Sequence, residues 1–328
     1  MTRRLLLAAG AALVALAASP FAVQAQNAYP NRPISMVVPF AAGGPTDTVA
    51  RLTAEVMARD LGQPVVVENV GGGGGTLGAA RVANARPDGS TILMHHIGMG
   101  TTPSLYRRLP YDPVNGFETV GLVTEVPMTV VAKRGIQANN LAELVALMRR
   151  EGTGINLANA GVGAASHLCG LLLQTAIQTQ VTTVPYRGTG PAITDLLSGT
   201  VDVMCDQTTN TTEQIRSGGI RAFAVTTRER VASLPDLPTA AEAGLPELEV
   251  SVWHGIYTPR GTPAAINDRL SRALQVALRD ERLVGRFNDL GTAPVSQERA
   301  TPDAHRAFWR ADVERWRPII QAAGVYAD

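Results

Sequence analysis

The sequence lacks the features that would place a protein in a membrane or on nucleic acid. After its first 25 residues it has no run of about 18 apolar residues, the length that a membrane-spanning helix needs. Charge of one sign is not in excess either, because 29 basic side chains stand against 28 acidic ones. This balance gives no electrostatic reason to expect nucleic acid or anionic lipid as a partner. The hydrophobic content of 45% is instead typical of a globular protein.

The first 25 residues have the pattern of a secretory signal peptide. Arg3 and Arg4 supply a positive start, residues 5–18 form a short apolar run, and residues 23–25 are suited to signal-peptidase cleavage. The apolar run is too short to span a bilayer, and no cysteine for lipid attachment follows it. We therefore predict a periplasmic protein that is cleaved near Ala25. The paired arginines leave both the general and the twin-arginine export route open.

The rest of the chain alternates apolar runs, glycine-rich turns and helical patterns, which predicts βαβ units. The expected fold is therefore α/β, with mostly parallel sheets flanked by helices. Strands are predicted at residues 34–39, 65–68, 91–95, 130–132, 155–158, 182–184, 201–205, 221–226 and 252–258. Helices are predicted at residues 48–61, 77–85, 141–150, 166–177, 193–197, 264–278 and 302–323, with Trp309 and Trp316 in the core.

The chain has no low-complexity linker that would divide it at one place. After the signal peptide at residues 1–25, about 300 residues remain, which is enough for two lobes. We predict that the lobes exchange strands, with residues 26–126 and 228–328 in the first lobe and residues 127–227 in the second. Crossings near residues 123–131 and 224–227 would form the hinge.

Three glycine-rich turns lie between a predicted strand and a predicted helix. They span residues 40–47, 71–76 and 160–166. Glycine lets backbone N–H groups come close to a ligand, and the following helix adds unpaired N–H donors and the positive end of its dipole. A single turn of this kind is more often only a tight connection, but three together favour a site that binds an anion.

Motifs for nucleotides, metals and catalysis are incomplete. Residues 73–78 match G-x-G-x-x-G, but the acidic residue that this fingerprint needs about 20 residues later is missing. His95 and His96 are adjacent, so on a strand they would point to opposite faces and could not chelate one ion. Ser166 and His167 are also neighbours, which is poor geometry for an activated nucleophile. We expect no cofactor, no metal and no catalysis, and we keep an exported hydrolase as the less favoured alternative.

The two cysteines, Cys169 and Cys205, fall in a predicted helix and a predicted strand. Export makes a disulfide between them possible. Their separation cannot be inferred from the sequence, so we favour two small buried thiols and keep the disulfide as the alternative.

Ordered blocks along the chain resemble the substrate-binding receptors of tripartite tricarboxylate transporters, often called Bug receptors. The resemblance covers nearly the whole chain after the signal peptide. The blocks are YPNRPI at 29–34, VPFAAGGPTD at 38–47, VEN at 67–69, RPDGST at 86–91, GVGAASHL at 161–168, VPYRG at 184–188, VDVMCD at 201–206, AVTT at 224–227, LPDLPT at 234–239 and EAG at 242–244.

The resemblance implies a two-lobed, type II-like periplasmic-binding-protein fold, a Venus flytrap that closes around its ligand. It implies a monomeric, non-catalytic solute receptor that binds a small mono- or dicarboxylate, aromatic and amino-acid carboxylates included. The receptor would deliver this ligand to the large and small membrane subunits of a transporter. A ligand-sensing protein that docks to a signalling partner is the alternative.

Carried over to this chain, the resemblance places ligand-binding residues on both sides of a cleft. Arg187 stands where a lysine is common in the family, and an arginine can hold a carboxylate through two parallel donors. An ionised Asp206 would repel a second carboxylate and favour a ligand with an amino or hydroxyl group. The predicted site residues are Phe40, Ala41, Gly44, Asp47, Gly74, Thr76 and His95 on one side, and Gly161, Ser166, His167, Tyr186, Arg187 and Asp206 on the other.

Overall fold

Strand β4 (Phe117–Lys133) joins two halves of one bent sheet in the computed structural model, which describes residues 29–324, 326 and 327. The predicted signal peptide and its cleavage site lie outside the described residues. In the first half the strand order is β2 (Val65–Asn69), β1 (Ile34–Val38), β3 (Thr91–His96), β9 (Ser251–Pro259) and β4. In the second half it is β4, β7 (Val203–Gln207), β5 (Asn156–Asn159) and β6 (Thr182–Pro185). Strands β8 (Ile220–Val225) and β10 (Ala293–Pro294) also pair with β4.

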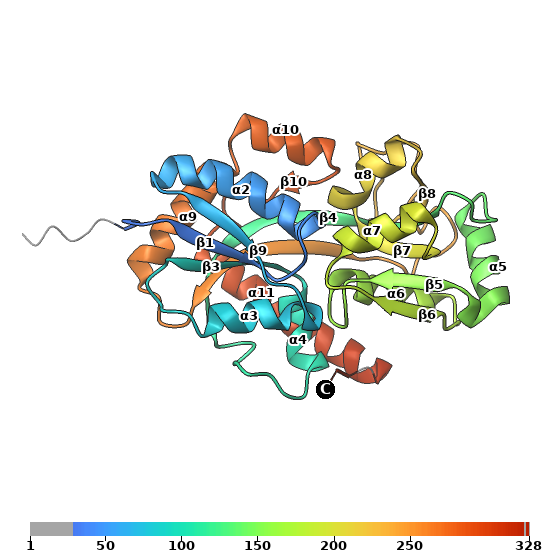
Figure 1. Cartoon of the computed structure of the whole chain (residues 1–328), viewed down its shortest axis with the longest axis horizontal. Helices are drawn as coiled ribbons and strands as arrows, with labels where there is room; N and C mark the ends of the chain where they lie inside the picture. Colours follow the sequence, from blue (N-terminus) through green and yellow to red (C-terminus); the bar gives the residue numbers. More distant parts are fainter. Residues whose placement is uncertain (1–28, 325, 328) are drawn as a thin grey trace, which may run out of the picture.

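The partners of β4 change along its length. Residues 117–127 pair with β9, whereas residues 128–133 pair with β7 and β8. Figure 1 shows β4 and β9 between two groups of elements, with β1 to β3 at one end of the molecule and β5 to β7 at the other. The change of partners between Pro127 and Met128 is therefore the point at which the chain passes from one half of the sheet to the other.

Between the named strands of the described residues, parallel pairing occurs in the three outer strands of each half. Strand β1 pairs in parallel with β2 and β3, and β5 pairs in parallel with β6 and β7. The pairs that involve β4 or β9 are antiparallel. Parallel neighbours need a crossover helix, and the outer strands are joined in that way. The predicted βαβ units thus build the outer part of each half, and the long strands between them make the whole sheet mixed.

The helices cover both faces of the two halves. Three of them were not expected from the sequence, namely α4, α8 and α10, because α4 contains Pro103 and two glycines, α8 is rich in threonine, and α10 is short. Among the described residues, no helix is long and apolar enough to cross a membrane. The helices are α2 (Pro45–Leu61), α3 (Thr76–Ala83), α4 (Gly98–Leu105), α5 (Leu141–Glu151), α6 (Ala165–Ala176), α7 (Thr189–Ser198), α8 (Thr208–Arg216), α9 (Ala264–Ala277), α10 (Glu281–Asp289) and α11 (Pro302–Ala323).

Helix α11 confirms the predicted core position of its two tryptophans. Trp309 and Trp316 are 1% and 2% exposed, and the helix packs on α4 and β4. The indole of Trp309 donates a hydrogen bond to the carbonyl oxygen of Met99 at 2.9 Å, so this polar atom is satisfied inside the core. The C-terminal helix is therefore an integral part of the first half of the fold.

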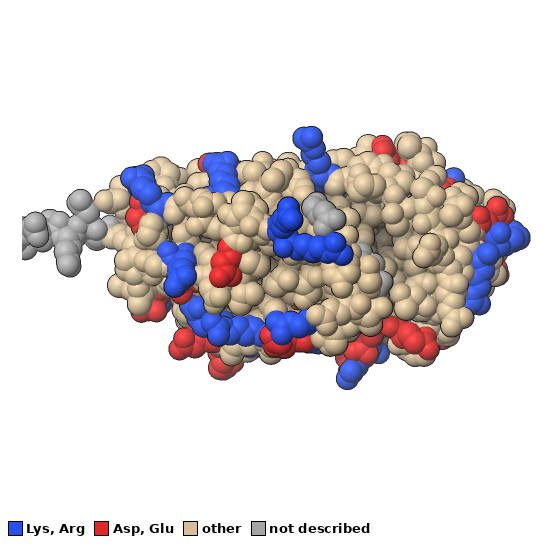
Figure 2. All heavy atoms as spheres, turned by 90° about the horizontal axis from the view of Figure 1, so that it is seen from below, with Lys and Arg blue, Asp and Glu red and all other residues tan. Residues whose placement is uncertain are grey.

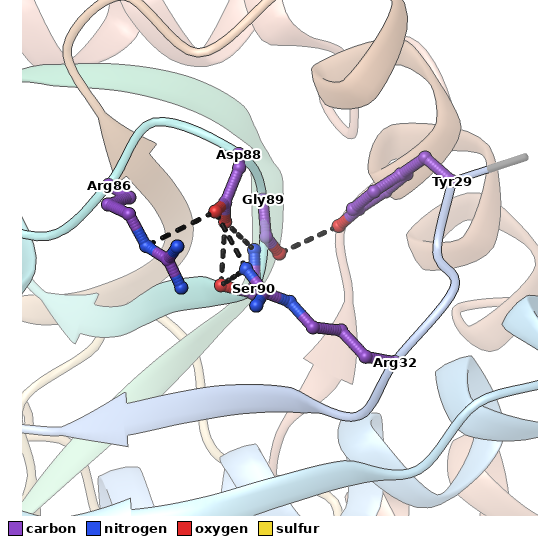
Figure 3. A network of polar contacts seen from close by, with 6 residues as sticks. All are labelled: Tyr29, Arg32, Arg86, Asp88, Gly89 and Ser90. Carbon is purple, nitrogen blue, oxygen red and sulfur yellow. Dashed lines mark hydrogen bonds and ion pairs between the residues drawn. The ribbon is translucent and has the colours of Figure 1, made fainter. Parts of the chain in front are cut away.

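The first described residues are tied to the turn before β3 (Figure 3). The hydroxyl of Tyr29 donates to the carbonyl oxygen of Gly89 at 2.8 Å, and the guanidinium of Arg32 donates to Asp88 at 2.7 Å and to the hydroxyl of Ser90 at 2.9 Å. These bonds hold the start of β1 beside β3. The ion pair between Arg32 and Asp88 is partly exposed, so it helps to fix the register of β1 and β3 more than it stabilises the fold.

The charged side chains on one face of the molecule show no separation by sign. In Figure 2, basic and acidic groups lie beside one another along that face. Ion pairs such as those of Arg81 with Glu68 and of Arg306 with Glu118 likewise bring opposite charges together. This interspersed pattern agrees with the balanced charge of the sequence.

The prediction of two free thiols is wrong. Cys169 of α6 and Cys205 of β7 form a disulfide, with 5.8 Å between their Cα atoms. Neither residue has exposed surface. The sequence could not show this pairing, because the two residues become neighbours only when α6 packs on β7.

Candidate functional site

A small cavity lies where the carboxyl ends of strands from both halves face each other. Phe40 follows β1 and His96 ends β3 in the first half, whereas Ala160 follows β5 and Asp206 lies near the end of β7 in the second. Ligands of open α/β sheets bind at this edge. The lining residues are Phe40, Gly44, Pro45, Thr46, His96, Ala160, Ala164, Ala165, Ser166, Thr189, Asp206 and Gln207.

Four helices begin at this cavity. The lining includes Gly44, Ala164 and Gln207, which are the N-cap residues of α2, α6 and α8, and Thr189, which is the first residue of α7. Within residues 29–324, none of these four helices has a side-chain hydrogen bond at its N-cap. The first-turn N–H groups of a helix have no partner inside the helix, and its dipole is positive there. The four helix starts therefore make the cavity attractive to an anion.

Charged donors do not contribute to the wall of the cavity. Among the described residues, no lysine or arginine lines it. The hydroxyl of Ser166 accepts a hydrogen bond from the N–H of Ala160 at 2.9 Å, so its own hydrogen can be donated to a ligand. Thr46 and Thr189 add two further hydroxyl groups. An anion would thus be held by backbone N–H groups and hydroxyls.

Asp206 is the acidic side chain of the cavity. It is 1% exposed, and its Oδ2 accepts a hydrogen bond from the side-chain amide of Asn210 at 2.5 Å. Its Oδ1 has no hydrogen-bond partner in the part of the chain that the structure describes. Burial raises the pKa of Asp206 to about 6, although the hydrogen bond from Asn210 opposes this shift. At neutral pH this carboxylate is mostly ionised, and Oδ1 can accept a donor from a ligand.

Phe40 and His96 contribute an aromatic and an imidazole ring to the lining of the cavity. Phe40 stacks on His96 with 4.6 Å between ring centroids, and His95 lies edge-on to Phe40 at 5.6 Å. Burial lowers the pKa of His96 to about 3, and burial also holds the pKa values of His95 and His254 well below the usual range. These imidazoles are neutral at pH 7, so His96 adds no charge to the lining of the cavity.

The prediction that His95 and His96 point to opposite faces is wrong. Their ring centroids are 4.9 Å apart. The N–H of His96 donates to Nδ1 of His95 at 2.7 Å, so the ring of His95 folds back over its own backbone. Strand β3 ends at His96, and α4 begins at Gly98, so the alternation of a regular strand does not continue here.

The two halves of the fold touch each other beside the cavity. The N–H of Ala41 donates to the carbonyl oxygen of Arg187 at 3.0 Å. The hydroxyl of Tyr106 lies 2.7 Å from the carbonyl oxygen of Gly73 and 2.8 Å from that of Val162, and its single hydrogen can serve one of them at a time. A Cβ atom on Gly74 would overlap the carbonyl oxygen of Val162. These contacts describe a molecule whose halves are closed on each other.

Four of the predicted site residues line the cavity. Phe40 and Gly44 come from the first half, and Ser166 and Asp206 come from the second. The glycine turns before α2 and α6 are therefore brought together around one cavity, and Asp206 is placed beside them.

Asp47 lies behind the first turn of α2 and supports it. Its carboxylate accepts hydrogen bonds from the N–H of Gly43 at 3.0 Å, from Asn69 at 2.9 Å and from Arg51 at 2.9 Å. Burial alone would raise the pKa of Asp47, but these hydrogen bonds hold it below its usual value. The side chain fixes the glycine turn, and it is not among the lining residues.

The other predicted residues surround the cavity at greater distance. Tyr186 donates from its hydroxyl to Asp195 at 2.6 Å, and Arg187 contributes its carbonyl oxygen while its side chain is exposed. His167 accepts the N–H of Gly163 at 3.4 Å. Ala41, Gly74, Thr76, His95 and Gly161 lie in or next to the contacts between the halves.

The sequence did not point to several lining residues. Thr189 lies within a fourth glycine turn between a strand and a helix, Gly188-Thr189-Gly190. This turn has the same pattern as those at residues 40–47, 71–76 and 160–166. Gln207 begins α8, whose threonine-rich sequence did not predict a helix. Thr46 contacts His254 of β9 at 3.3 Å, a neighbour that only the folded chain provides.

The fold and this cavity define a periplasmic solute-binding protein. The solved structure of the periplasmic binding protein BugD is 49% identical in sequence, covers 92% of this chain and 100% of its own, and superimposes with a TM-score of 0.89. The structure of MatC from Rhodopseudomonas palustris with bound malate is 40% identical, covers 89% of this chain and 100% of its own, and has a TM-score of 0.86.

Sequence comparison then gives the family. The profile described as tripartite tricarboxylate transporter family receptor matches residues 49–325. A UPF0065 protein of Agrobacterium vitis is 50% identical over 93% of this chain and 88% of its own length. The chain belongs to the tripartite tricarboxylate transporter receptor family, which confirms the resemblance found in the sequence and the predicted two-lobed fold.

Proposed function

We propose that the protein is a non-catalytic periplasmic receptor that binds a small carboxylate between its two halves. The observation that carries this proposal is the meeting of four helix starts without side-chain caps around one cavity. Each hydrogen bond to a charged group contributes roughly 1.5–3 kcal/mol. Three to five such bonds, less the cost of ordering the ligand, can reach about −8 kcal/mol, the free energy of micromolar binding.

The two lobes are proposed to comprise residues 26–126 with 228–328, and residues 127–227. The change of partners along β4 supports a hinge at the first crossing, and a second crossing near residues 224–227 completes it. In this division Phe40 and Gly44 belong to one lobe, and Ser166 and Asp206 to the other. Closure would exclude water and strengthen the hydrogen bonds to the ligand.

The chemistry of the cavity narrows the range of ligands that we propose for it. One carboxylate would lie against the starts of α2 and α6, in contact with Gly44 and Ser166. Because Asp206 is ionised at neutral pH and has a free acceptor, we propose that it favours a ligand with a hydroxyl or amino group. The related MatC structure holds malate, a hydroxy acid, which agrees with this expectation.

Membership of the family supports a role in delivering the ligand to a transporter. We propose export through the signal peptide, cleavage near Ala25, and transfer of the carboxylate from a monomeric receptor to the large and small membrane subunits of a tripartite tricarboxylate-type transporter. The family assignment and the predicted export sequence support this route.

A thermal-shift screen tests the receptor function. The panel would contain aliphatic, aromatic and amino-acid carboxylates, with the amide of each best ligand as the matched uncharged control. A ligand at 100 times its Kd stabilises the folded state by about 2.7 kcal/mol, which would raise Tm by about 4 °C for a chain of this length. If no carboxylate of the panel moves Tm at millimolar concentration, the proposed function is wrong.

A further inference from the structure

The disulfide lies directly beneath the ligand cavity. Cys169 is four residues after Ala165 in α6, so both side chains lie on one face of the helix, and Ala165 lines the cavity. Cys205 immediately precedes Asp206 in β7. The covalent bond therefore joins the helix that presents N–H donors to the strand that presents the acidic acceptor.

The residues around the disulfide couple its position to the geometry of the cavity. Neither cysteine has exposed surface, and α6 packs on β7 around them. The hydroxyl of Ser166 is bonded to the N–H of Ala160, which closes the turn before α6. Asp206 is held from the other side by Asn210 of α8. A displacement of α6 along β7 would therefore change the distance between the donors of α6 and the carboxylate of Asp206.

We propose that the Cys169–Cys205 disulfide is a positioning element of the ligand site, so that ligand affinity depends on it and not only the stability of the fold. The inference rests on the proposed carboxylate-binding function. Binding groups must be held to within about 0.5 Å to act together, and a site that is fixed before the ligand arrives loses less free energy on binding.

The coupling between ligand binding and the disulfide must be reciprocal. If the oxidised protein binds the ligand more tightly than the reduced protein by some factor, the ligand must make the disulfide harder to reduce by the same factor. Dithiothreitol is a suitable reductant for this measurement. The S–S bond of the protein breaks and its two sulfurs take up two electrons and two protons, while dithiothreitol loses the same number and closes to a cyclic disulfide.

The first test compares malate binding by the wild-type protein and by Cys169→Ala/Cys205→Ala. We expect a Kd about tenfold higher for the variant, within the usual range of coupling. Leu173→Ala is the matched control, because Leu173 is fully buried one turn further along α6 and does not line the cavity. It should lower Tm with little change in Kd. A folded double-cysteine variant with unchanged Kd would overturn the proposal.

The second test does not depend on the folding of a variant. Wild-type protein is equilibrated in buffers of reduced and oxidised dithiothreitol with and without malate, and the protein thiols are counted by alkylation and mass spectrometry. Malate should shift the midpoint ratio about tenfold toward more reductant. An unshifted midpoint with bound malate would contradict the positioning role alone. Failure of every carboxylate of the panel to bind the oxidised wild type would overturn the proposed function together with this inference.

Discussion

Helices that begin at the cavity and helices that begin at the outer surface differ in how their first N–H groups are satisfied. At the surface, the side chains of Asn140, Asp280 and Thr301 accept hydrogen bonds from the first turns of α5, α10 and α11. At the cavity, α2, α6, α7 and α8 have no such bond within residues 29–324. Helices α3, α4 and α9 also have no side-chain cap among these residues, so the site is marked by the meeting of four uncapped helix starts at one cavity and not by the missing caps alone.

The proposed binding function accounts for this difference, because the chain would give up stability at these helix starts for binding. A side-chain cap stabilises a helix by about 1 kcal/mol, and each helix at the cavity forgoes it. In the proposed complex the ligand carboxylate takes the place of the missing caps. Local rules for stability are commonly broken at functional sites.

Giving α6 a cap of its own should have the largest effect. Ala164 has φ −69° and ψ 157°, a conformation that suits an N-cap residue. In Ala164→Asp, the new carboxylate would accept the N–H groups that the ligand needs and would occupy its position. We expect Kd to rise more than 100-fold by isothermal titration calorimetry, with unchanged far-UV circular dichroism. The neutral Ala164→Asn should weaken binding less. A folded Ala164→Asp protein that binds as tightly as wild type would show that α6 does not hold the ligand.

Neutralising the acidic residue of the cavity should change which ligands are preferred. Wild-type protein is expected to bind malate about tenfold more tightly than succinate, because the malate hydroxyl can donate to Asp206, and a hydrogen bond to a charged group is worth roughly 1.5–3 kcal/mol. In Asp206→Asn the preference should fall below about threefold. Calorimetric titration of both ligands into both proteins measures it. An equal preference for malate over succinate in the two proteins would show that Asp206 does not select the ligand.

The affinity for a plain dicarboxylate should depend on pH. The pKa of Asp206 is about 6 in the folded protein, raised by burial. A bound carboxylate would raise this pKa further, so above pH 6 binding must be accompanied by uptake of a proton. We expect the affinity for succinate to fall by up to about tenfold per pH unit between pH 6 and 7.5. Asp206→Asn should show a flat profile, and a flat profile for wild type would contradict the assignment.

Asp206 should also make the stability of the unliganded protein depend on pH, and the direction of this dependence follows from its pKa. Its pKa is about 6 when folded, against 3.8 for an isolated aspartate. The folded state therefore binds this proton more tightly than the unfolded chain does. The contribution of Asp206 to folding becomes less favourable as pH rises from about 4 to 6. Urea unfolding of wild type and Asp206→Asn over this range should show the difference growing in favour of the variant.

Removing a cap at the outer surface should have the smallest effect and none on binding. The side chain of Asn140 accepts a hydrogen bond from the N–H of Glu143 at 2.9 Å at the start of α5. Asn140→Ala is expected to lower the free energy of unfolding by about 1 kcal/mol in urea titrations. The Kd for malate should stay unchanged. A clear loss of affinity would mean that the surface and cavity helices do not differ in role.

Much of the fold could be predicted because its cause is local. The strands β1, β2, β3 and β6 and the helices α2, α5, α6, α9 and α11 follow from apolar periodicity and turn residues, within a few residues of the observed bounds. The elements that were missed lack such a pattern. Helix α8 is rich in threonine, and β4 is one strand of 17 residues of which only a short part was predicted.

The candidate site was predictable in part for the same reason. Gly44 and Ser166 lie at helix starts that follow glycine turns, and this pattern can be read along the chain. Thr189 had the same pattern and could have been found. His96 and Gln207 could not be predicted. The position of His96 in the cavity depends on how β3 ends, and that of Gln207 depends on α8, a helix that the sequence pattern does not predict.

The sequence by itself determined the alternation of strands and helices, the glycine turns between them and, through its ordered blocks, the family. The tertiary structure decided which helix starts meet, that Cys169 is bonded to Cys205, and that Asp206 lies among the donors with an unpaired oxygen. The physical reason is the range of the forces that matter. Backbone preferences and apolar periodicity act over a few residues, whereas the cavity joins segments from residue 40 to residue 207 that only the packing of the sheet brings together.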